Sequence, residues 1–271
     1  MKNLLLAAAI GDISGVPYEF KGRTKDYDAI DLLNPKNKYS DDTICTFACA
    51  EALIEGKDMA ECLHRRGRED FYRGFGGRFA KWLMSPEIKP SYGSFGNGSG
   101  MRASSAGFLA KTKEECIELA TQTALPTHDH PEGIKGAQAT ALCIYLARKG
   151  EPVKDIRNRI SKEFGYELSL SVEEIRPRYS WQGLDGKGNG GICQDSVPQA
   201  IICALEARDF EDAIRNAVSI GGDSDTIGCI TGGIAEGLFG IPEAIREEGM
   251  TYLPKELRLI VEEFETKYGC R

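Results

Sequence analysis

Two short acidic clusters carry the clearest chemical signal in the sequence. The first is Ser40-Asp41-Asp42-Thr43, and the second reads GGDSDT over residues 221–226. Each combines carboxylates with hydroxyl groups, and each precedes an apolar run with the spacing of a helix. Oxygen ligands of this kind suit hard divalent cations such as Mg²⁺ and Mn²⁺. If the fold joins the clusters, the sequence predicts a two-metal site and a hydrolytic enzyme.

Helix capping is the simpler interpretation of each cluster, because a helix N-terminus stabilises acidic and hydroxyl side chains. The side chains of Asp41 and Asp42 would diverge by about 100° within a helix, so both reach one site only at a helix start. In the second cluster, Gly221 and Gly222 allow the close backbone approach that a ligand-binding loop needs. The presence of two such clusters in one chain favours a shared metal site over two separate caps.

Three further segments carry side chains suited to a binding cleft. Glu19 is a candidate general acid or base, with an ordinary surface carboxylate as the alternative. The glycine-rich segment 93–102 is either a plain loop or a loop whose backbone N–H groups wrap phosphates while Phe95 stacks on a flat ring. It lacks the spacing of a P-loop, so ATP binding is not expected. His128, in THDHPE, is expected to hydrogen-bond a substrate rather than bind zinc, because the only histidine outside this segment is His64.

The elements that would position these residues are almost all helical. Apolar spacing predicts helices over residues 4–10, 44–54, 137–145, 197–205, 210–218, 227–238, 245–250 and 257–264. Gly150 is a candidate C-cap, and Pro198 would lie just inside a helix capped by Asp195 or Ser196. The segment 167–172 is the single strand candidate. We therefore expect an all-α fold with many helices around one core, forming a single domain over residues 1–271.

Two glycine-rich stretches, 86–100 and 176–193, are expected to be irregular loops. For the second, a functional loop and a disordered excursion are both open. Three glycines in the apolar run 227–238 would let another helix pack closely: Gly228, Gly232 and Gly237.

Composition excludes several classes of protein. A chain of 271 residues with 41% hydrophobic content can bury a sizeable core, and a net charge of −7 argues against a general nucleic-acid-binding surface. Nine cysteines without a CxxC pair indicate a reducing cytoplasm. Met1-Lys2 and the apolar residues 4–10 imitate a signal peptide, but they lead directly into Gly11-Asp12, so a buried first helix is expected. The apolar run 227–241 is too short to span a membrane.

The chemistry-bearing segments also resemble a known family. In order they read GDISGVPYE, SDDT, GFGGRFAKW, GSFGNGSGMR, THDHPE and GGDSDTIGCITGGIAEGLFG, running from Gly11 to Gly240. Each is weak alone, but the set strongly resembles the ADP-ribosylglycohydrolase family. This resemblance implies an all-α orthogonal multi-helix bundle with a binuclear Mg²⁺ or Mn²⁺ centre in a cleft. The implied metal ligands are Ser40, Asp41, Asp42, Asp223, Asp225 and Thr226.

The resemblance also implies a substrate, an ADP-ribosyl group joined through C1″ to arginine, serine or a small acceptor. Glu19 matches a mobile glutamate near the scissile bond, and Asp129 and His130 receive no role. The cations would orient the ribose diol, and Glu19, Asp41 or Asp42 would transfer protons. Phe95 and the 176–193 loop are expected to border the acceptor. The implied substrate-binding residues are Gly93, Ser94, Phe95, Gly96, Asn97, Gly98, Ser99 and His128.

Two other functions remain open at this point. A binding or structural homologue could keep the fold without catalysis, although such a role would not require Asp41, Asp42, Asp223 and Asp225 together. A different two-metal hydrolase would cleave a generic phosphodiester instead of releasing ADP-ribose. The leaving group and the preferred metal are not determined by the sequence, and a monomer is the expected state.

Overall fold

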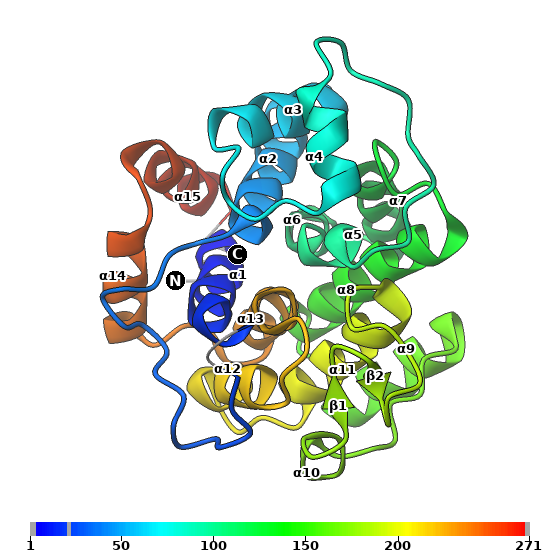
Figure 1. Cartoon of the computed structure of the whole chain (residues 1–271), viewed down its shortest axis with the longest axis vertical. Coiled ribbons are helices and arrows are strands. Elements are labelled where there is room, and N and C mark those ends of the chain that lie inside the picture. The colour runs from blue at the N-terminus through cyan, green and yellow to red at the C-terminus, as the bar shows by residue number, and fades with distance from the viewer. Residues whose placement is uncertain (1–3, 21–22, 269–271) are drawn as a thin grey trace.

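The computed structural model describes residues 4–20 and 23–268, and their regular secondary structure is almost entirely helical (Figure 1). The all-α prediction is therefore confirmed. Met1, Lys2 and Cys270 lie outside the described residues. Within them, no helix is long and apolar enough to cross a membrane, and every cysteine is unpaired and buried.

The first half of the chain forms one 3-10 helix, η1, and eight α-helices. Their bounds are α1 Leu4–Gly15, η1 Val16–Tyr18, α2 Asp41–Glu55, α3 Met59–Glu69, α4 Gly77–Met84, α5 Gly98–Met101, α6 Ser104–Leu109, α7 Lys113–Ala124 and α8 Pro131–Arg148. The second half adds one small hairpin. Its bounds are α9 Val153–Phe164, α10 Val172–Ile175, β1 Tyr179–Ser180, β2 Gly183–Leu184, α11 Cys193–Leu205, α12 Phe210–Ser219, α13 Ser224–Phe239, α14 Glu243–Tyr252 and α15 Lys255–Tyr268.

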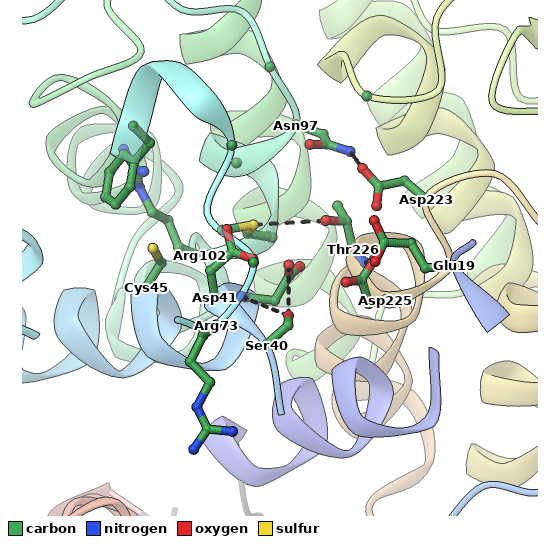
Figure 2. Close-up of a pocket in the computed structure, with 18 of the residues that line it drawn as sticks. Glu19, Ser40, Asp41, Cys45, Arg73, Asn97, Arg102, Asp223, Asp225 and Thr226 are labelled. Carbon is green, nitrogen blue, oxygen red and sulfur yellow. Dashed lines mark hydrogen bonds between the residues drawn. The ribbon is translucent and has the colours of Figure 1, made fainter. Parts of the chain in front are cut away.

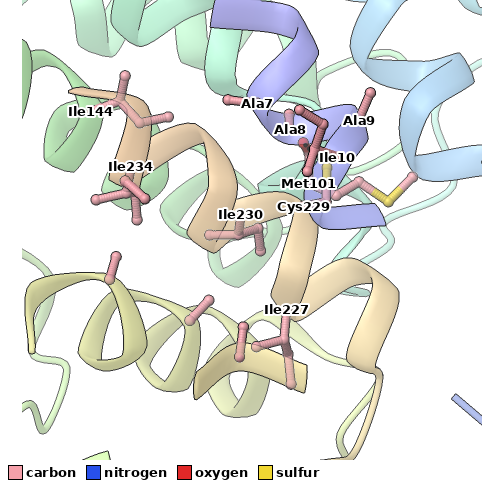
Figure 3. Packing of buried hydrophobic residues seen from close by; sticks show 14 of the residues in the cluster. Ala7, Ala8, Ala9, Ile10, Met101, Ile144, Ile227, Cys229, Ile230 and Ile234 are labelled. Carbon is pink, nitrogen blue, oxygen red and sulfur yellow. Dashed lines mark hydrogen bonds between the residues drawn. The ribbon is translucent and has the colours of Figure 1, made fainter. Parts of the chain in front are cut away.

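The centre of the molecule is the crossing of α1 and α13, which pack against each other more extensively than any other pair (Figures 1 and 3). Their backbones touch. A Cβ atom added to Gly11 would lie 2.0 Å from the carbonyl oxygen of Gly228, and one on Gly232 would lie 2.3 Å from that of Ala7. Larger residues at these glycines would push the two helices apart.

Other helices enclose this central pair. α8, α11 and α12 pack on α13, while α2 and α6 contact α1. Gly237 of α13 approaches α8, where an added Cβ would lie 3.0 Å from the Ala147 side chain. The expectation that the glycines of α13 allow close helix packing is therefore confirmed for Gly228, Gly232 and Gly237. Because α1 and α13 are covered on most sides, both are apolar around nearly their whole circumference.

Two local expectations were wrong. The segment 167–172 is not a strand, because Ser171 and Glu174 form a reciprocal capping box that starts α10 instead. α11 begins at Cys193 after the N-cap Ile192, so Pro198 lies inside the helix and neither Asp195 nor Ser196 is its cap. Gly150 fits its prediction more closely, since it follows the C-cap of α8 with a left-handed φ of 76°.

The helix crossing predicts that Gly228→Ala is strongly destabilising. The new Cβ would lie 2.4 Å from the carbonyl oxygen of Gly11, and backbone atoms cannot yield as a flexible side chain can. We expect the free energy of unfolding to fall by about 2–3 kcal/mol in a denaturant titration. Gly77→Ala is the matched control, because nothing lies within 4 Å of its added Cβ. Equal stability of the two variants would contradict the close crossing.

Candidate active site

The N-terminus of α2 is organised by a buried carboxylate from α1. Ser40 is the N-cap, and its Oγ accepts a hydrogen bond from the Asp42 backbone N–H at 3.1 Å. Asp12, which is fully buried, accepts from the backbone N–H groups of Ser40 at 2.9 Å and Thr43 at 3.1 Å. It also accepts from the Ser40 hydroxyl at 2.7 Å and the Thr43 hydroxyl at 2.5 Å. The capping interpretation of the first cluster is therefore confirmed, and Asp12 ties α1 to α2.

The second cluster begins with two glycines in the left-handed region. Gly221 has φ 73° and Gly222 has φ 78°, a conformation that few other residues adopt without strain. Asp223 stands at the N-cap position of α13, but its side chain makes no cap hydrogen bond. It accepts instead from Asn97 Nδ2 at 2.7 Å, as Figure 2 shows. Asp225 lies in the first turn of the helix, with its Oδ1 bound to the Thr226 N–H at 2.9 Å.

The two clusters meet at one cavity of about 720 Å³. Glu19, which follows η1, offers an oxygen that lies within 4.8 Å of oxygens from Asp223 and Asp225. Asp41 and Asp42 line the same cavity from α2, together with Ser40 and Thr226. Figure 2 shows Asp41, Ser40 and Thr226 at this cavity. The fold thus brings together every residue expected to bind metal.

Burial and mutual repulsion make the ionisation of these acids unfavourable. Burial and the neighbouring carboxylates raise the pKa values of Asp41, Asp42 and Asp225 well above the usual range. The same two causes raise the pKa of Glu19 to about 8, and burial raises that of Asp223 to about 6. No ion pair among the described residues reaches any of the five.

These residues fit hard divalent cations. Asp42 Oδ1 is buried without a hydrogen-bond partner, although an unsatisfied carboxylate oxygen is costly. Ser40 donates its proton to Asp12 and accepts from the Asp42 N–H, which leaves one hydroxyl lone pair for a cation. The donors are all oxygen, as Mg²⁺ and Mn²⁺ prefer. A cation would satisfy the orphan oxygen and offset the repulsion among the carboxylates.

The glycine-rich segment 93–102 supplies another part of the cavity wall, but not with all its residues. Ser94, Gly96, Asn97, Gly98 and His128 line the cavity. The Gly98 backbone passes close to the imidazole, because an added Cβ would lie 3.3 Å from His128 Nε2. Asn97 donates from its amide nitrogen to Asp223 and to Ser196 Oγ at 3.0 Å, so this nitrogen holds the Asp223 carboxylate in place.

Three of the expected substrate-binding residues lie outside the cavity lining: Gly93, Phe95 and Ser99. Ser99 is fully buried, and its hydroxyl donates to the Gly133 carbonyl at 2.7 Å. The Phe95 ring is partly exposed and packs against His130, with ring centroids 5.0 Å apart. The structure therefore separates these residues from the acidic cluster.

His128 is held as a neutral imidazole. Burial and the nearby Arg102 and Arg78 guanidinium groups lower its pKa well below the usual range. Its Nδ1 lies 2.8 Å from Thr127 Oγ1, which accepts from Arg102 Nη2 at 2.8 Å. Nε2 faces the glycine loop, so the ring can hydrogen-bond a ligand in the cavity.

Sequence reasoning placed three further residues in segments of the site without giving them individual roles: Asp12, Arg102 and Trp181. The signal for Asp12 is its position as an isolated acid within an apolar helix. Arg102, which is 1% exposed, is the last residue of the glycine-rich segment 93–102 and lines the cavity. Trp181 lies in the 176–193 loop, and with Gly191 it brings this loop to the cavity.

Comparisons of sequence and structure with known proteins agree on one family. A family model described as ADP-ribosylglycohydrolase matches residues 1–268. "ADP-ribosylhydrolase ARH3" of Danio rerio is 27% identical over 75% of this chain and 70% of its own length. "ADP-ribosylarginine hydrolase Tri1" of Pseudomonas putida is 22% identical over 89% of this chain and 70% of its own length. A solved "ADP-ribosylglycohydrolase-related protein complex" has a TM-score of 0.69 at 21% identity and covers 96% of this chain and 94% of that chain, which confirms the expected bundle fold.

The crowded carboxylates predict a gain in stability for metal-free Asp225→Asn. The raised pKa of Asp225 means that its ionisation costs stability as the pH rises from about 4 through the folded-state pKa. At pH 8 with a chelator, we expect the free energy of unfolding of the variant to be about 1–3 kcal/mol higher than that of the wild type. Below about pH 4 this difference should vanish.

The same titration with Mg²⁺ or Mn²⁺ tests the metal site. Added cation should stabilise the wild type and leave Asp225→Asn nearly unchanged, by mass action on the folded state. Asp58→Asn serves as the control, because Asp58 caps α3 and does not line the cavity. Equal stabilisation of wild type and Asp225→Asn would contradict a role for Asp225 in cation binding.

Proposed function

The chain belongs to the ADP-ribosylglycohydrolase family, and on that premise we propose that it is a metal-dependent hydrolase that releases ADP-ribose from a modified acceptor. The bond cleaved is the glycosidic bond at C1″. One observation carries the proposal: Glu19, Asp41, Asp42, Asp223 and Asp225 converge on a single cavity from three separate parts of the chain. The printed names of the relatives, which describe ADP-ribosyl hydrolases, support the same class of reaction.

Two Mg²⁺ or Mn²⁺ ions are the proposed cofactors. Ser40, Asp41 and Asp42 would hold them from α2, and Asp223, Asp225 and Thr226 from α13. When bound, such ions supply positive charge that orients the ribose diol and increases the acidity of a water. The orphaned Asp42 Oδ1 and the raised pKa values of the cluster support this assignment.

Glu19 is the proposed proton-transfer group. Burial and the charges of Asp225 and Asp12 raise its pKa to about 8, so that its carboxyl group can both hold and release a proton near neutral pH. A protonated carboxyl group can protonate the leaving oxygen or nitrogen as positive charge builds on the ribose. Asp41 and Asp42 are the other candidates for accepting a proton from water.

The remaining wall of the cavity is suited to the ADP-ribosyl group. Ser94, Gly96 and Gly98 line it, the Ser94 hydroxyl can donate a hydrogen bond, and the neutral His128 offers a ring nitrogen. Such groups can hold phosphate and ribose oxygens without a competing carboxylate. A cavity of about 720 Å³ is in the size range of small-molecule sites.

The direct test is release of free ADP-ribose from defined substrates. Arginine-linked, serine-linked and O-acetyl-linked ADP-ribose would each be incubated with the protein and Mg²⁺, Mn²⁺ or chelator. We expect release from at least one substrate, only with a cation, and no cleavage of a generic phosphodiester. Binding of ADP-ribose without release from any substrate would instead support a non-catalytic homologue.

Glu19→Gln should separate chemistry from binding. The amide keeps the shape of the side chain but cannot transfer a proton, so we expect kcat to fall about 100-fold or more. The dissociation constant for ADP-ribose should change only a few-fold. Glu55→Gln, at the exposed C-terminal end of α2, is the matched control and should retain wild-type kcat. Unchanged turnover by Glu19→Gln would remove Glu19 from the mechanism.

A further inference from the structure

The small β1–β2 hairpin contacts two segments that carry acids of the site, the segment of Glu19 and the loop of Asp223. Trp181, in its turn, donates from Nε1 to the main-chain carbonyl of Glu19 at 3.1 Å. Phe20 stacks on the same indole ring, with centroids 5.7 Å apart and planes inclined by 5°. The Glu19 carbonyl also accepts from Arg23 Nε at 2.8 Å. A residue 162 positions further along the chain is therefore bonded to the backbone that carries the Glu19 carboxylate.

The same hairpin is locked to the loop that carries Asp223. Tyr179, which is 1% exposed, lies under Gly222 so closely that an added Cβ would meet its ring at 2.5 Å. The Tyr179 carbonyl accepts from Lys25 Nζ at 2.7 Å, and this ammonium also donates to the carbonyl of Ile220. The first strand of the hairpin thus has a fixed position relative to the second acidic cluster.

A third connection runs through the end of the hairpin loop. The Gly190 N–H donates to the Trp181 carbonyl at 2.8 Å, and the Gly190 carbonyl accepts from Ser196 Oγ at 2.5 Å. Asn97, which donates to Ser196 and to Asp223, completes the connection. Trp181 is therefore joined to Asp223 by hydrogen bonds and to Glu19 by its indole.

Glu19 itself has little regular structure to hold it. It follows a 3-10 helix of three residues, and its own N–H makes only a long bond to the Val16 carbonyl at 3.4 Å. Short 3-10 turns have weak hydrogen-bond geometry and open at small cost. A carboxylate in such a segment needs an external contact to keep a defined place.

We propose that Trp181 is a positioning residue, which fixes the Glu19 carboxylate relative to Asp223 and Asp225. This inference rests on the proposed function, because it concerns the placement of the proton-transfer group. The indole N–H bonds a main-chain carbonyl, so it places the Glu19 backbone without touching the carboxylate. The hairpin acts as a brace between the two halves of the site.

Trp181→Phe tests the brace, because it keeps an aromatic ring for Phe20 and removes the N–H. Loss of one hydrogen bond that places the reacting group should lower kcat about tenfold. KM and the cation-induced stabilisation should stay within twofold of the wild type. Trp82→Phe is the matched control: Trp82 Nε1 also donates to a carbonyl, that of Lys89 at 2.8 Å, and its ring does not line the cavity.

A double-mutant cycle identifies the route of the effect. If Trp181 acts through Glu19, Trp181→Phe should change kcat less than twofold in a Glu19→Gln background. A tenfold loss in that background would overturn the proposal. A rise in KM with unchanged kcat would also overturn it, because it would mark Trp181 as a contact for the acceptor.

Amide hydrogen exchange tests whether Trp181 holds the Glu19 segment, and it does not require a measurement of catalysis. In Trp181→Phe, the backbone amides of Tyr18, Glu19 and Phe20 should exchange faster, while Trp82→Phe should match the wild type there. Unchanged exchange in Trp181→Phe would overturn the proposal that Trp181 holds the segment of Glu19. If the wild type released no ADP-ribose, the proposed function would fail, and exchange would still decide whether Trp181 holds this segment.

Discussion

The contact between the backbones of α1 and α13 is the constraint on which the rest of the structure depends. Gly11 and Gly228 face each other there, and Gly15 lies against Ser224 so closely that an added Cβ would meet its carbonyl oxygen at 2.3 Å. This crossing places Asp12 and the segment leading to Glu19 beside the first turn of α13. A wider helix separation would enlarge the distance between the two sets of acids.

The site concentrates negative charge in a place where the fold alone does not neutralise it. Asp12 is the exception, because four donors from Ser40 and Thr43 satisfy its carboxylate. That arrangement turns a buried acid into a link between α1 and α2. The other carboxylates face the cavity, and burial with mutual repulsion raises their pKa values. Stability is thereby reduced at the place where cations would bind, as is common at functional sites.

Local sequence signals predicted eight of the helices, namely α1, α2, α8 and α11–α15, but not α3–α7, α9 or α10. Two other local predictions failed where two signals competed. Apolar periodicity located the helices of the core, because each buries one face or more against its neighbours. The alternation over 167–172 was misleading, since the capping box of Ser171 and Glu174 prevailed. Pro198 likewise suggested a helix start, although α11 had already begun at Cys193. Propensity and pattern describe neighbours along the chain, and tertiary packing can override them.

The sequence by itself determined which side chains are available for chemistry and that both acidic clusters stand at helix starts. Those properties depend on residue type and on hydrogen bonds between near neighbours. Only the tertiary structure decided that Asn97 turns to Asp223, that Ser99 is buried away from the cavity, and that Trp181 reaches the backbone of Glu19. The reason is physical: distances between remote segments are set by helix packing across the core, where a few glycine contacts determine how closely the chain can approach itself.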